Sequence, residues 1–319
     1  MRCLRMMLTI LALSFLAPAY SQSEKPIRFI VGYPAGAVSD TLTRMLAEEL
    51  RKQLGQTVIV ENRVGAAGRL SCEALKAAAP DGQTLLFAPV ALVAIFPHTY
   101  KSLRYDPFVD FAPVSHVAGF QIGLAIANNV PATKLAEYVA LVKRDPKFGN
   151  YGSSGAGSIP HFVGVLIGRA AGIEMTHIPY KGTAPVLTDL AGGNVSAGSL
   201  GIGDLSSLHR AGKLKVLATS GAKRSPAMPD VATFTELGLG IEGSGWFSVF
   251  TRAGSPKPLV DRYARIFADA ARGPAMQELF DKTGLDGSGT TPEELARIHR
   301  ADYERWGPVI KASGFTSDD

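Results

Sequence analysis

Short apolar runs alternate regularly along the sequence with segments of helical periodicity, and this alternation limits the folds that are open to the chain. Residues 27–31 form an apolar run that ends in a Gly/Pro turn, and Leu and Met side chains then recur at helical spacing over residues 42–54. The same order returns in an apolar run at 57–60, a helical segment at 70–79 and another apolar run at 84–88. Repetition of this unit predicts an α/β protein in which a parallel sheet is covered by helices.

The rest of the chain continues the alternation. Residues 114–127 are largely apolar and are expected to be extended. Two helices are predicted in the tail, one starting near Pro256 and one at Thr291, which forms a capping box with Glu294. The remaining predicted helices lie at 135–143, 159–171 and 185–191, and the remaining predicted strands at 176–178 and 215–219.

Residues 1–21 have the three parts of a secretory signal peptide. Arg2 and Arg5 form a basic start, an apolar run covers 6–18, and Ala19 and Ser21 place small side chains at the −3 and −1 positions of a cleavage site. An uncleaved membrane anchor is the alternative, but this run is shorter than the roughly 20 residues that a spanning helix needs. Cys3 precedes the run, which argues against a lipid-modified cysteine at the cleavage point. The mature protein is therefore expected to be soluble and periplasmic.

Charge and cysteine content exclude several classes of protein. The chain has 319 residues with a formal charge of +5, which falls to +3 when Arg2 and Arg5 leave with the signal peptide. That charge is too small and too dispersed for nucleic-acid binding. The two cysteines and six histidines have no metal-ligand spacing, so a zinc site or a disulfide scaffold is not expected. Cys72 is left without an intramolecular partner.

Three loops, at 33–40, 153–158 and 180–185, each follow a predicted strand and open a predicted helix. Ligands of α/β sheets collect at the carboxyl ends of strands, and backbone amides at a helix start favour an anion. All three loops therefore predict a bound negative group. For Ser39 a purely structural role as N-cap is equally plausible, and Lys181 either pairs with a ligand carboxylate or is simply solvated.

The glycine-rich loops do not match nucleotide or hydrolase motifs. Residues 152–157 read GSSGAG, which lacks the GxGxxG order, and no GxxxxGK[ST] string occurs. A serine hydrolase needs GxSxG, which is also missing, so a secreted enzyme using Ser154 and His161 is the weaker alternative. His161 falls in the first turn of a predicted helix, where a capping role is favoured. No catalysis, cofactor or metal is expected.

The order of several strings resembles one family. These strings are FIVGYPAGAVSD, VENRVGAAG, APDGQTLL, LRYDPFVDFAPV, SSGAGSIPH, HIPYKGTAPVLTDLAGG, RSPAMPDVATFTELG and TPEEL. In this order they resemble the Bug-type (TctC-like) receptors, the extracytoplasmic solute-binding proteins of tripartite tricarboxylate transporters. The resemblance covers residues 25–315. It implies a two-lobed periplasmic-binding-protein fold with a ligand cleft between the lobes, and a small carboxylate that is delivered to a membrane permease or, alternatively, to a signalling sensor.

The resemblance also implies domain limits and a binding site. Lobe 1 is expected to hold residues 22–122 and 222–319, with the C-terminal helices returning to it, and lobe 2 to hold residues 123–221. The protein is expected to be a monomer. The family's two grips on the carboxylate fall on Tyr33, Pro34, Ala35, Gly36, Ala37 and Asp40 in the first lobe, and on Ser153, Ser154, Gly157, Ser158, His161, Tyr180, Lys181 and Gly182 in the second.

The chain departs from the family pattern at four positions. Ala37 stands where a second glycine is usual, and Val165, Ser196 and Leu200 stand where acidic residues are common. These changes suggest a cleft with fewer acidic side chains, in which an amino group on the ligand lacks a partner. A plain or aromatic carboxylate is therefore expected in preference to an amino acid.

Overall fold

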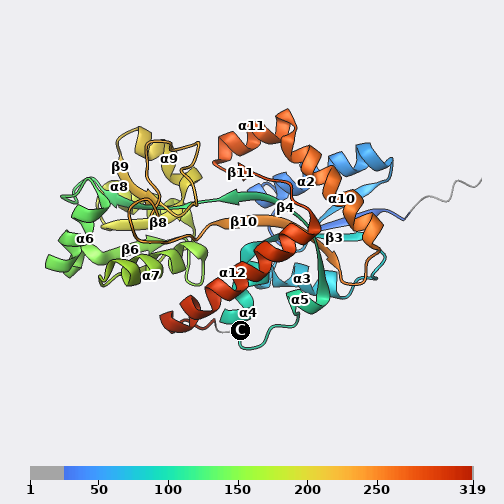
Figure 1. Ribbon diagram of the computed structural model, residues 1–319, viewed down its shortest axis with the longest axis horizontal. Helices are drawn as coiled ribbons and strands as arrows, with labels where there is room; N and C mark the ends of the chain where they lie inside the picture. The colour runs from blue at the N-terminus through green and yellow to red at the C-terminus, as the bar shows by residue number, and fades with distance from the viewer. Residues whose placement is uncertain (1–24, 318–319) are drawn as a thin grey trace, which may run out of the picture.

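The computed structural model describes residues 25–317, and the predicted signal peptide at 1–21 lies outside them. The described chain forms two lobes, each built on its own sheet, which lie side by side along the long axis (Figure 1). None of the helices in this part of the chain is both long and apolar enough to cross a membrane.

The first lobe contains a six-stranded sheet with strand order β11-β4-β10-β3-β1-β2. Its strands are β1 (Ile27–Val31), β2 (Val58–Asn62), β3 (Thr84–Pro89), β4 (Phe111–Phe120), β10 (Gly245–Arg252) and β11 (Asp286–Gly287). Its helices are α2 (Val38–Leu54), α3 (Arg69–Lys76), α4 (Phe96–Thr99), α5 (Pro107–Asp110), α10 (Lys257–Arg272), α11 (Pro274–Thr283) and α12 (Pro292–Ser313), with short turns η1 (Ala66–Gly68) and η2 (Ala91–Ile95).

The second lobe contains a five-stranded sheet with strand order β7-β6-β8-β5-β9. Its strands are β5 (Ile122–Ala127), β6 (Asn150–Ser153), β7 (Thr176–Pro179), β8 (Ala197–Gly201) and β9 (Leu214–Thr219). Its helices are α6 (Leu135–Arg144), α7 (Ile159–Ala171), α8 (Thr183–Gly192) and α9 (Ile202–Arg210), with the short turn η3 (Pro146–Gly149).

The sheets are mixed, which corrects the expectation of parallel sheets. Strand β1 pairs in parallel with β2 and β3, but β10 is antiparallel to both β3 and β4, and β5 is antiparallel to β8 and β9. The apolar stretch at 114–127 is two strands, because β4 ends in one sheet and β5 begins in the other, with Gln121 between them. Strand β10 runs back from the second lobe into the first sheet, whereas β4 runs out towards the second lobe. Strand β10 is therefore antiparallel to its neighbours β3 and β4.

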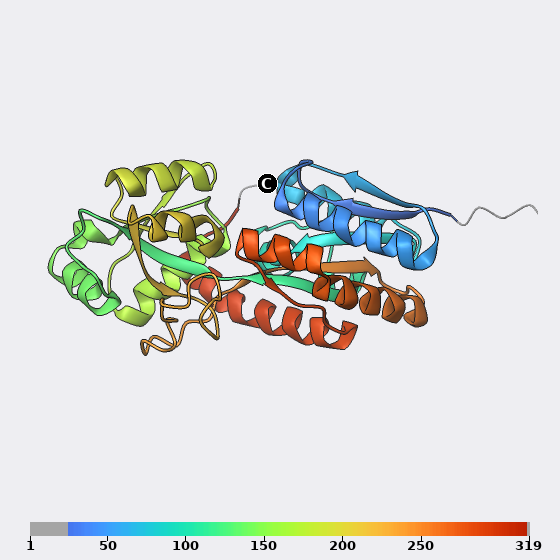
Figure 2. The same ribbon diagram turned by 90° about the horizontal axis from the view of Figure 1, so that it is seen from above.

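Alternate residues of the central strands fill different cores, as the period of a strand requires. Phe29 and Phe87 pack on the face covered by α2, α10 and α11, whereas Ile30, Leu86 and Phe250 face the opposite side, towards α3, η2 and α12. Both faces of the sheet are thus buried, which explains why its strands read as continuous apolar runs. The carboxyl ends of β1 and β3 are left free to point towards the second lobe (Figure 2).

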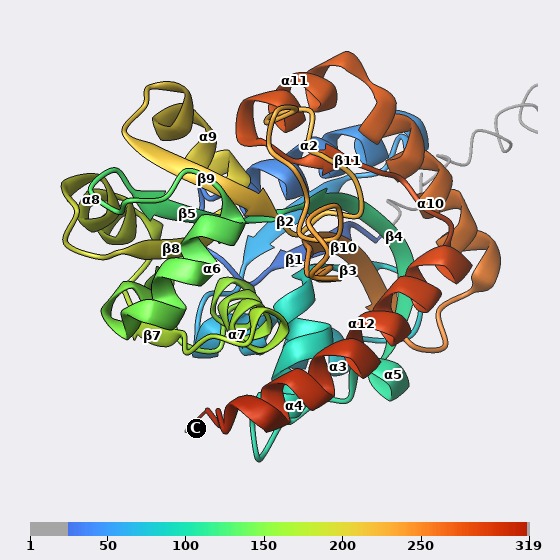
Figure 3. The ribbon, with the colours of Figure 1, turned by 60° about the vertical axis from the view of Figure 1, so that its left-hand side comes forward.

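The C-terminal helices pack mainly on the first lobe, but α12 reaches the second. It contacts β4, η2 and α4, and its far end contacts α7 (Figure 3). Its capping box at Thr291 and Glu294 is present as the sequence indicates. Helix α11 and strand β10 were not predicted from the sequence.

Residues 220–244, which link β9 to β10, lie against the second lobe before they enter the first. The Thr219 N–H donates to the Ala232 carbonyl, and the Phe234 N–H donates to the Thr219 carbonyl. Ser220 Oγ accepts from the Ile122 N–H at 2.9 Å and donates to the Gly243 carbonyl at 3.1 Å, so it joins the two segments that pass between the sheets.

Candidate functional site

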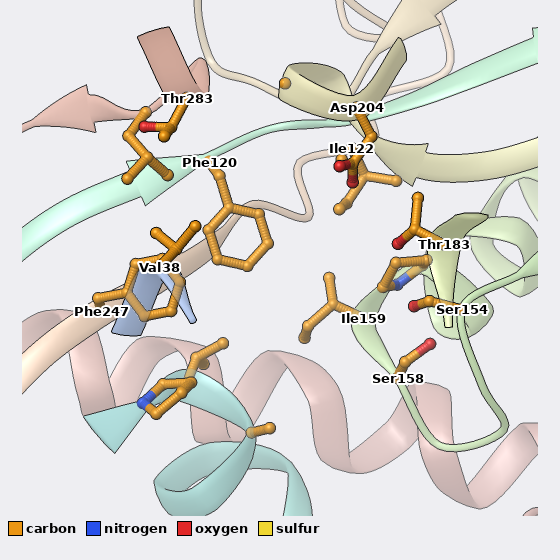
Figure 4. Close-up of a pocket in the computed structure, with 17 residues that line it drawn as sticks. Val38, Phe120, Ile122, Ser154, Ser158, Ile159, Thr183, Asp204, Phe247 and Thr283 are labelled. Atoms are coloured by element: carbon orange, nitrogen blue, oxygen red, sulfur yellow. The ribbon is translucent and has the colours of Figure 1, made fainter. Parts of the chain in front are cut away.

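A cavity of about 340 Å³ lies between the lobes, and both lobes line it. Val38 at the start of α2 and Phe247 of β10 come from the first lobe, and Ser154 and Thr183 come from the second (Figure 4). The volume is at the low end of the range of about 300–1,000 Å³ for ligand pockets, which suits a small metabolite.

Three helices that begin at the cavity have no side-chain cap. Helices α2, α8 and α9 begin beside lining residues, and no side chain caps them. In α9 the Ile202 N–H donates to the Gln121 carbonyl at 3.0 Å, so the starts of α2 and α8 are the more available to a ligand. The first amides of a helix have no intrahelical partner, and the helix dipole makes such an end favourable for an anion. Helix α7 also begins here, but Ser158 caps it. The cavity can therefore hold an anion without a cationic side chain.

Two of the cavity's hydroxyl groups are available to a ligand. Ser154 Oγ and Thr183 Oγ1 make no hydrogen bond within residues 25–317, and both side chains lie on the same side of the cavity (Figure 4). By contrast, Ser158 Oγ donates to the Gly155 carbonyl at 2.7 Å and accepts from the His161 N–H. Ser153 is fully buried and hydrogen-bonded to His177 Nε2 at 2.7 Å.

The opposite side of the cavity is apolar. The rings of Phe120 and Phe247 lie 5.3 Å apart, centroid to centroid, and Val38 lies beside them (Figure 4). Ile122 and Ile159 continue this surface towards the hydroxyl groups. The arrangement matches a ligand with an anionic end and an apolar body.

Asp40 shapes the first loop and does not line the cavity. Its carboxylate accepts from the Gly36 N–H at 2.9 Å, from Arg44 Nε at 2.9 Å and from Asn62 Nδ2 at 2.8 Å. Burial acts to raise the pKa of Asp40, but its three hydrogen-bond donors outweigh burial and hold the pKa below its ordinary value. Asp40 therefore ties the loop to the start of α2 and to β2.

The other predicted residues of the first loop also lie outside the cavity lining. Tyr33 is half-buried, and burial raises the pKa of its phenol to about 12. Pro34, Ala35 and Gly36 are exposed, and Gly36 has a φ of +85°. Ala37 is the N-cap of α2, so the structural alternative for Ser39, a role as N-cap, is wrong. The helix starts at Val38, and it is Val38 that faces the cavity.

His161 stabilises the loop at 153–158 through a hydrogen bond and does not line the cavity. Its Nδ1 accepts from the Gly157 N–H at 3.2 Å, and its ring stacks on His177 with centroids 3.9 Å apart. Burial lowers the pKa of His161 to about 4, and burial together with neighbouring His161 lowers the pKa of His177 to about 4. Gly157 has a φ of +74° and lies against the Phe315 ring. No hydrogen bond joins Ser154 to His161 among the described residues, so the nucleophile–base pair of the hydrolase hypothesis is not formed.

The third loop is joined to the second by its backbone. The Gly182 N–H donates to the Ser154 carbonyl at 3.0 Å, which places Thr183 beside Ser154. Tyr180 Oη donates to Asp189 Oδ2 at 2.8 Å and is engaged within its own lobe. Lys181 is exposed and does not line the cavity.

The structure adds an acidic residue that sequence reasoning missed. Asp204, in the first turn of α9, lines the cavity, so the cavity contains an acidic side chain that the sequence analysis did not include. Leu200 belongs to strand β8, whereas Asp204 lies beyond the end of that strand, where α9 has begun. Of the predicted residues, Ser154 and Ser158 line the cavity, and Thr183, Val38, Phe120 and Phe247 were missed.

Comparison with known proteins finds a family model and curated relatives that match most of the chain. The family model described as "Tripartite tricarboxylate transporter family receptor" matches residues 42–315. A relative from Cupriavidus necator, named "UPF0065 protein in gbd 5'region", is 32% identical, and the match covers 93% of this chain and 91% of the relative.

Two solved structures carry ligands in their descriptions. R. palustris Rpa4515 with adipate is 28% identical, has a TM-score of 0.77 and covers 92% of this chain and 99% of its own. MatC from Rhodopseudomonas palustris with bound malate is 27% identical, has a TM-score of 0.73 and covers 89% of this chain and 98% of its own. Adipate and malate are both dicarboxylates, and both matches extend over most of this chain.

Proposed function

Because the chain belongs to the tripartite tricarboxylate transporter receptor family, we propose that it is a periplasmic solute-binding protein without catalytic activity. It captures a small carboxylate in the cavity between its lobes and delivers it to the membrane permease of such a transporter. The observation that carries this proposal is the cavity itself, in which uncapped helix starts from both lobes and two unpaired hydroxyls surround an apolar wall. The ligands named for the two related structures support a carboxylate.

The proposed anion grip consists of Ser154, Thr183 and the first amides of α8. We expect three other predicted residues to shape the loops around the ligand without contacting it. Asp40 accepts a hydrogen bond from the first loop, and Ser158 and His161 make hydrogen bonds within the second loop. Capture then requires movement about the two segments near Gln121 and Gly243, where the chain passes between sheets. We place the second boundary between the lobes near residue 244, because Thr233 pairs with Thr219 of β9 and the Gly243 N–H donates to the Ser220 carbonyl.

Ser154→Ala is expected to weaken carboxylate binding by about 0.5–3 kcal/mol, because an unengaged donor is removed from the anion. The ligand is first found by a thermal-shift screen of carboxylates, in which a hundredfold excess over the dissociation constant stabilises the protein by about 2.7 kcal/mol. Calorimetric titration of that ligand into the wild type and the variant then gives the two affinities.

Ser158→Ala is the matched control, because its hydroxyl caps α7. It is expected to lower the free energy of unfolding by about 1 kcal/mol, whereas Ser154→Ala leaves that free energy nearly unchanged. Equal affinities of the wild type and Ser154→Ala contradict the proposed grip. The ligand is expected to be recovered chemically unchanged, and turnover that disappears in Ser154→Ala restores the hydrolase hypothesis.

A further inference from the structure

Asp204 is the ionisable side chain among the described residues that line the cavity, since none of the others is Lys, Arg, His, Asp or Glu. It lies in the first turn of α9, and its side chain points into the cavity (Figure 4). The charge inside this cavity is therefore set by Asp204 and by the partial charges of the helix starts.

The Asp204 carboxylate has no fixed partner in the protein. No hydrogen bond or ion pair joins it to another residue within 25–317, and its side chain is exposed to the cavity. Burial by the surrounding walls raises the pKa of Asp204, while its place at the start of α9 favours the ionised form. An ionised carboxylate that loses water when a ligand enters needs a cation or a strong donor in return.

The positions of the polar groups restrict the ligand further. Asp204, Ser154 and Thr183 lie on one side of the cavity, and Phe120, Phe247 and Val38 lie on the other (Figure 4). A second carboxylate on the ligand would be repelled by Asp204 on the polar side, and on the apolar side it would meet only the amides at the start of α2, beside Val38. A ligand with one carboxylate and a neighbouring cation meets matching groups at the polar side and leaves its apolar part for the aromatic rings.

We propose that the ligand is an apolar α-amino carboxylate whose ammonium group pairs with Asp204. Its carboxylate lies at Ser154 and Thr183, and its side chain packs against Phe120 and Phe247. This inference rests on the proposed function, which it narrows from carboxylates in general to one class, and it reverses the preference for a plain carboxylate that the sequence suggested. The carboxylate and ammonium groups of an α-amino acid share one carbon, which suits donors and an acceptor on the same side of the cavity.

The test uses ligand pairs that differ in the amino group alone. L-phenylalanine is compared with 3-phenylpropanoate, and L-leucine with 4-methylpentanoate, by calorimetric titration of the mature protein at pH 7 and fixed salt. We expect the amino member of at least one pair to bind about tenfold or more tightly than its partner, as a charge-assisted hydrogen bond provides. Asp204→Asn is expected to remove that preference, and Asp204→Glu to keep it.

Asp230→Asn is the matched control, because Asp230 is an exposed acid of the second lobe outside this cavity. It is expected to keep the preference of the wild type. Binding of 3-phenylpropanoate, 4-methylpentanoate or adipate more tightly than of either amino acid overturns this inference and leaves the proposed function standing. A preference for the amino members that survives in Asp204→Asn also overturns it. If no carboxylate binds in the wider screen, the proposed function fails and the inference fails with it.

Discussion

Gly203→Ala is expected to weaken ligand binding by about 5- to 150-fold, the equivalent of 1–3 kcal/mol of overpacking. Gly203 of α9 belongs to the second lobe, and a Cβ built on it lies 2.1 Å from the Thr283 carbonyl oxygen at the end of α11 in the first lobe. Real Cβ atoms do not approach so closely, and the atom in the way is backbone. The lobes must therefore separate, and because Gly203 and Thr283 both line the cavity, its walls separate with them.

Gly192→Ala is the matched control for this variant. Gly192 ends α8 in the same lobe, and the nearest atom to a Cβ there is 3.5 Å away, at ordinary contact distance. We expect unchanged affinity in Gly192→Ala and a nearly unchanged melting temperature in both variants, since rigid lobes that part slightly keep their cores. Unchanged affinity in Gly203→Ala contradicts a site formed by the approach of the lobes.

Acidification is expected to destabilise the second-lobe loop through its stacked histidines. Burial lowers the pKa of His161 to about 4, so its neutral form is favoured in the folded protein. The stability that this preference provides is complete above the unfolded pKa of about 6.5 and is lost as the pH falls towards 4. His161 is 7% exposed, and its shift corresponds to roughly 3 kcal/mol at the acid end.

The measurement is urea unfolding at pH 7, 5.5 and 4.5 in wild type and His161→Asn. The Asn side chain offers an acceptor near the position of Nδ1 for the Gly157 N–H but does not titrate. We expect a smaller fall in the free energy of unfolding in the variant than in the wild type. Other histidines with lowered pKa values, such as His116 and His299, titrate in both proteins and provide the shared background. Identical pH profiles contradict the assignment to His161.

Local signals were sufficient to predict many of the elements. Helix α7 was predicted at its observed bounds, because its apolar periodicity and the glycine that ends it, Gly172, can both be read from residues close together in the sequence. The capping box of α12 is equally local. The direction of β10 was not predictable in this way, because its antiparallel pairing with β3 and β4 depends on where the chain returns from the second lobe.

In the candidate site, too, residues with a local sequence signal were predicted and residues without one were not. The loop that contains Ser154 could be recognised from its glycines and its place before a helix. Asp204 and Phe247 could not, because what makes them part of the cavity is the approach of two lobes, which no local pattern records. Asp40 shows the converse: its motif is evident in the sequence, but its hydrogen bonds are all made within the protein.

A crystal structure of the complex will show whether the cavity between the lobes is the carboxylate site. We expect a carboxylate oxygen of the ligand within about 3 Å of Ser154 Oγ or Thr183 Oγ1, as a hydrogen bond requires. We also expect the apolar part of the ligand against Phe120 and Phe247. A saturating ligand found instead in the surface groove between α2 and α10, with the interlobe cavity holding only water, would contradict this assignment.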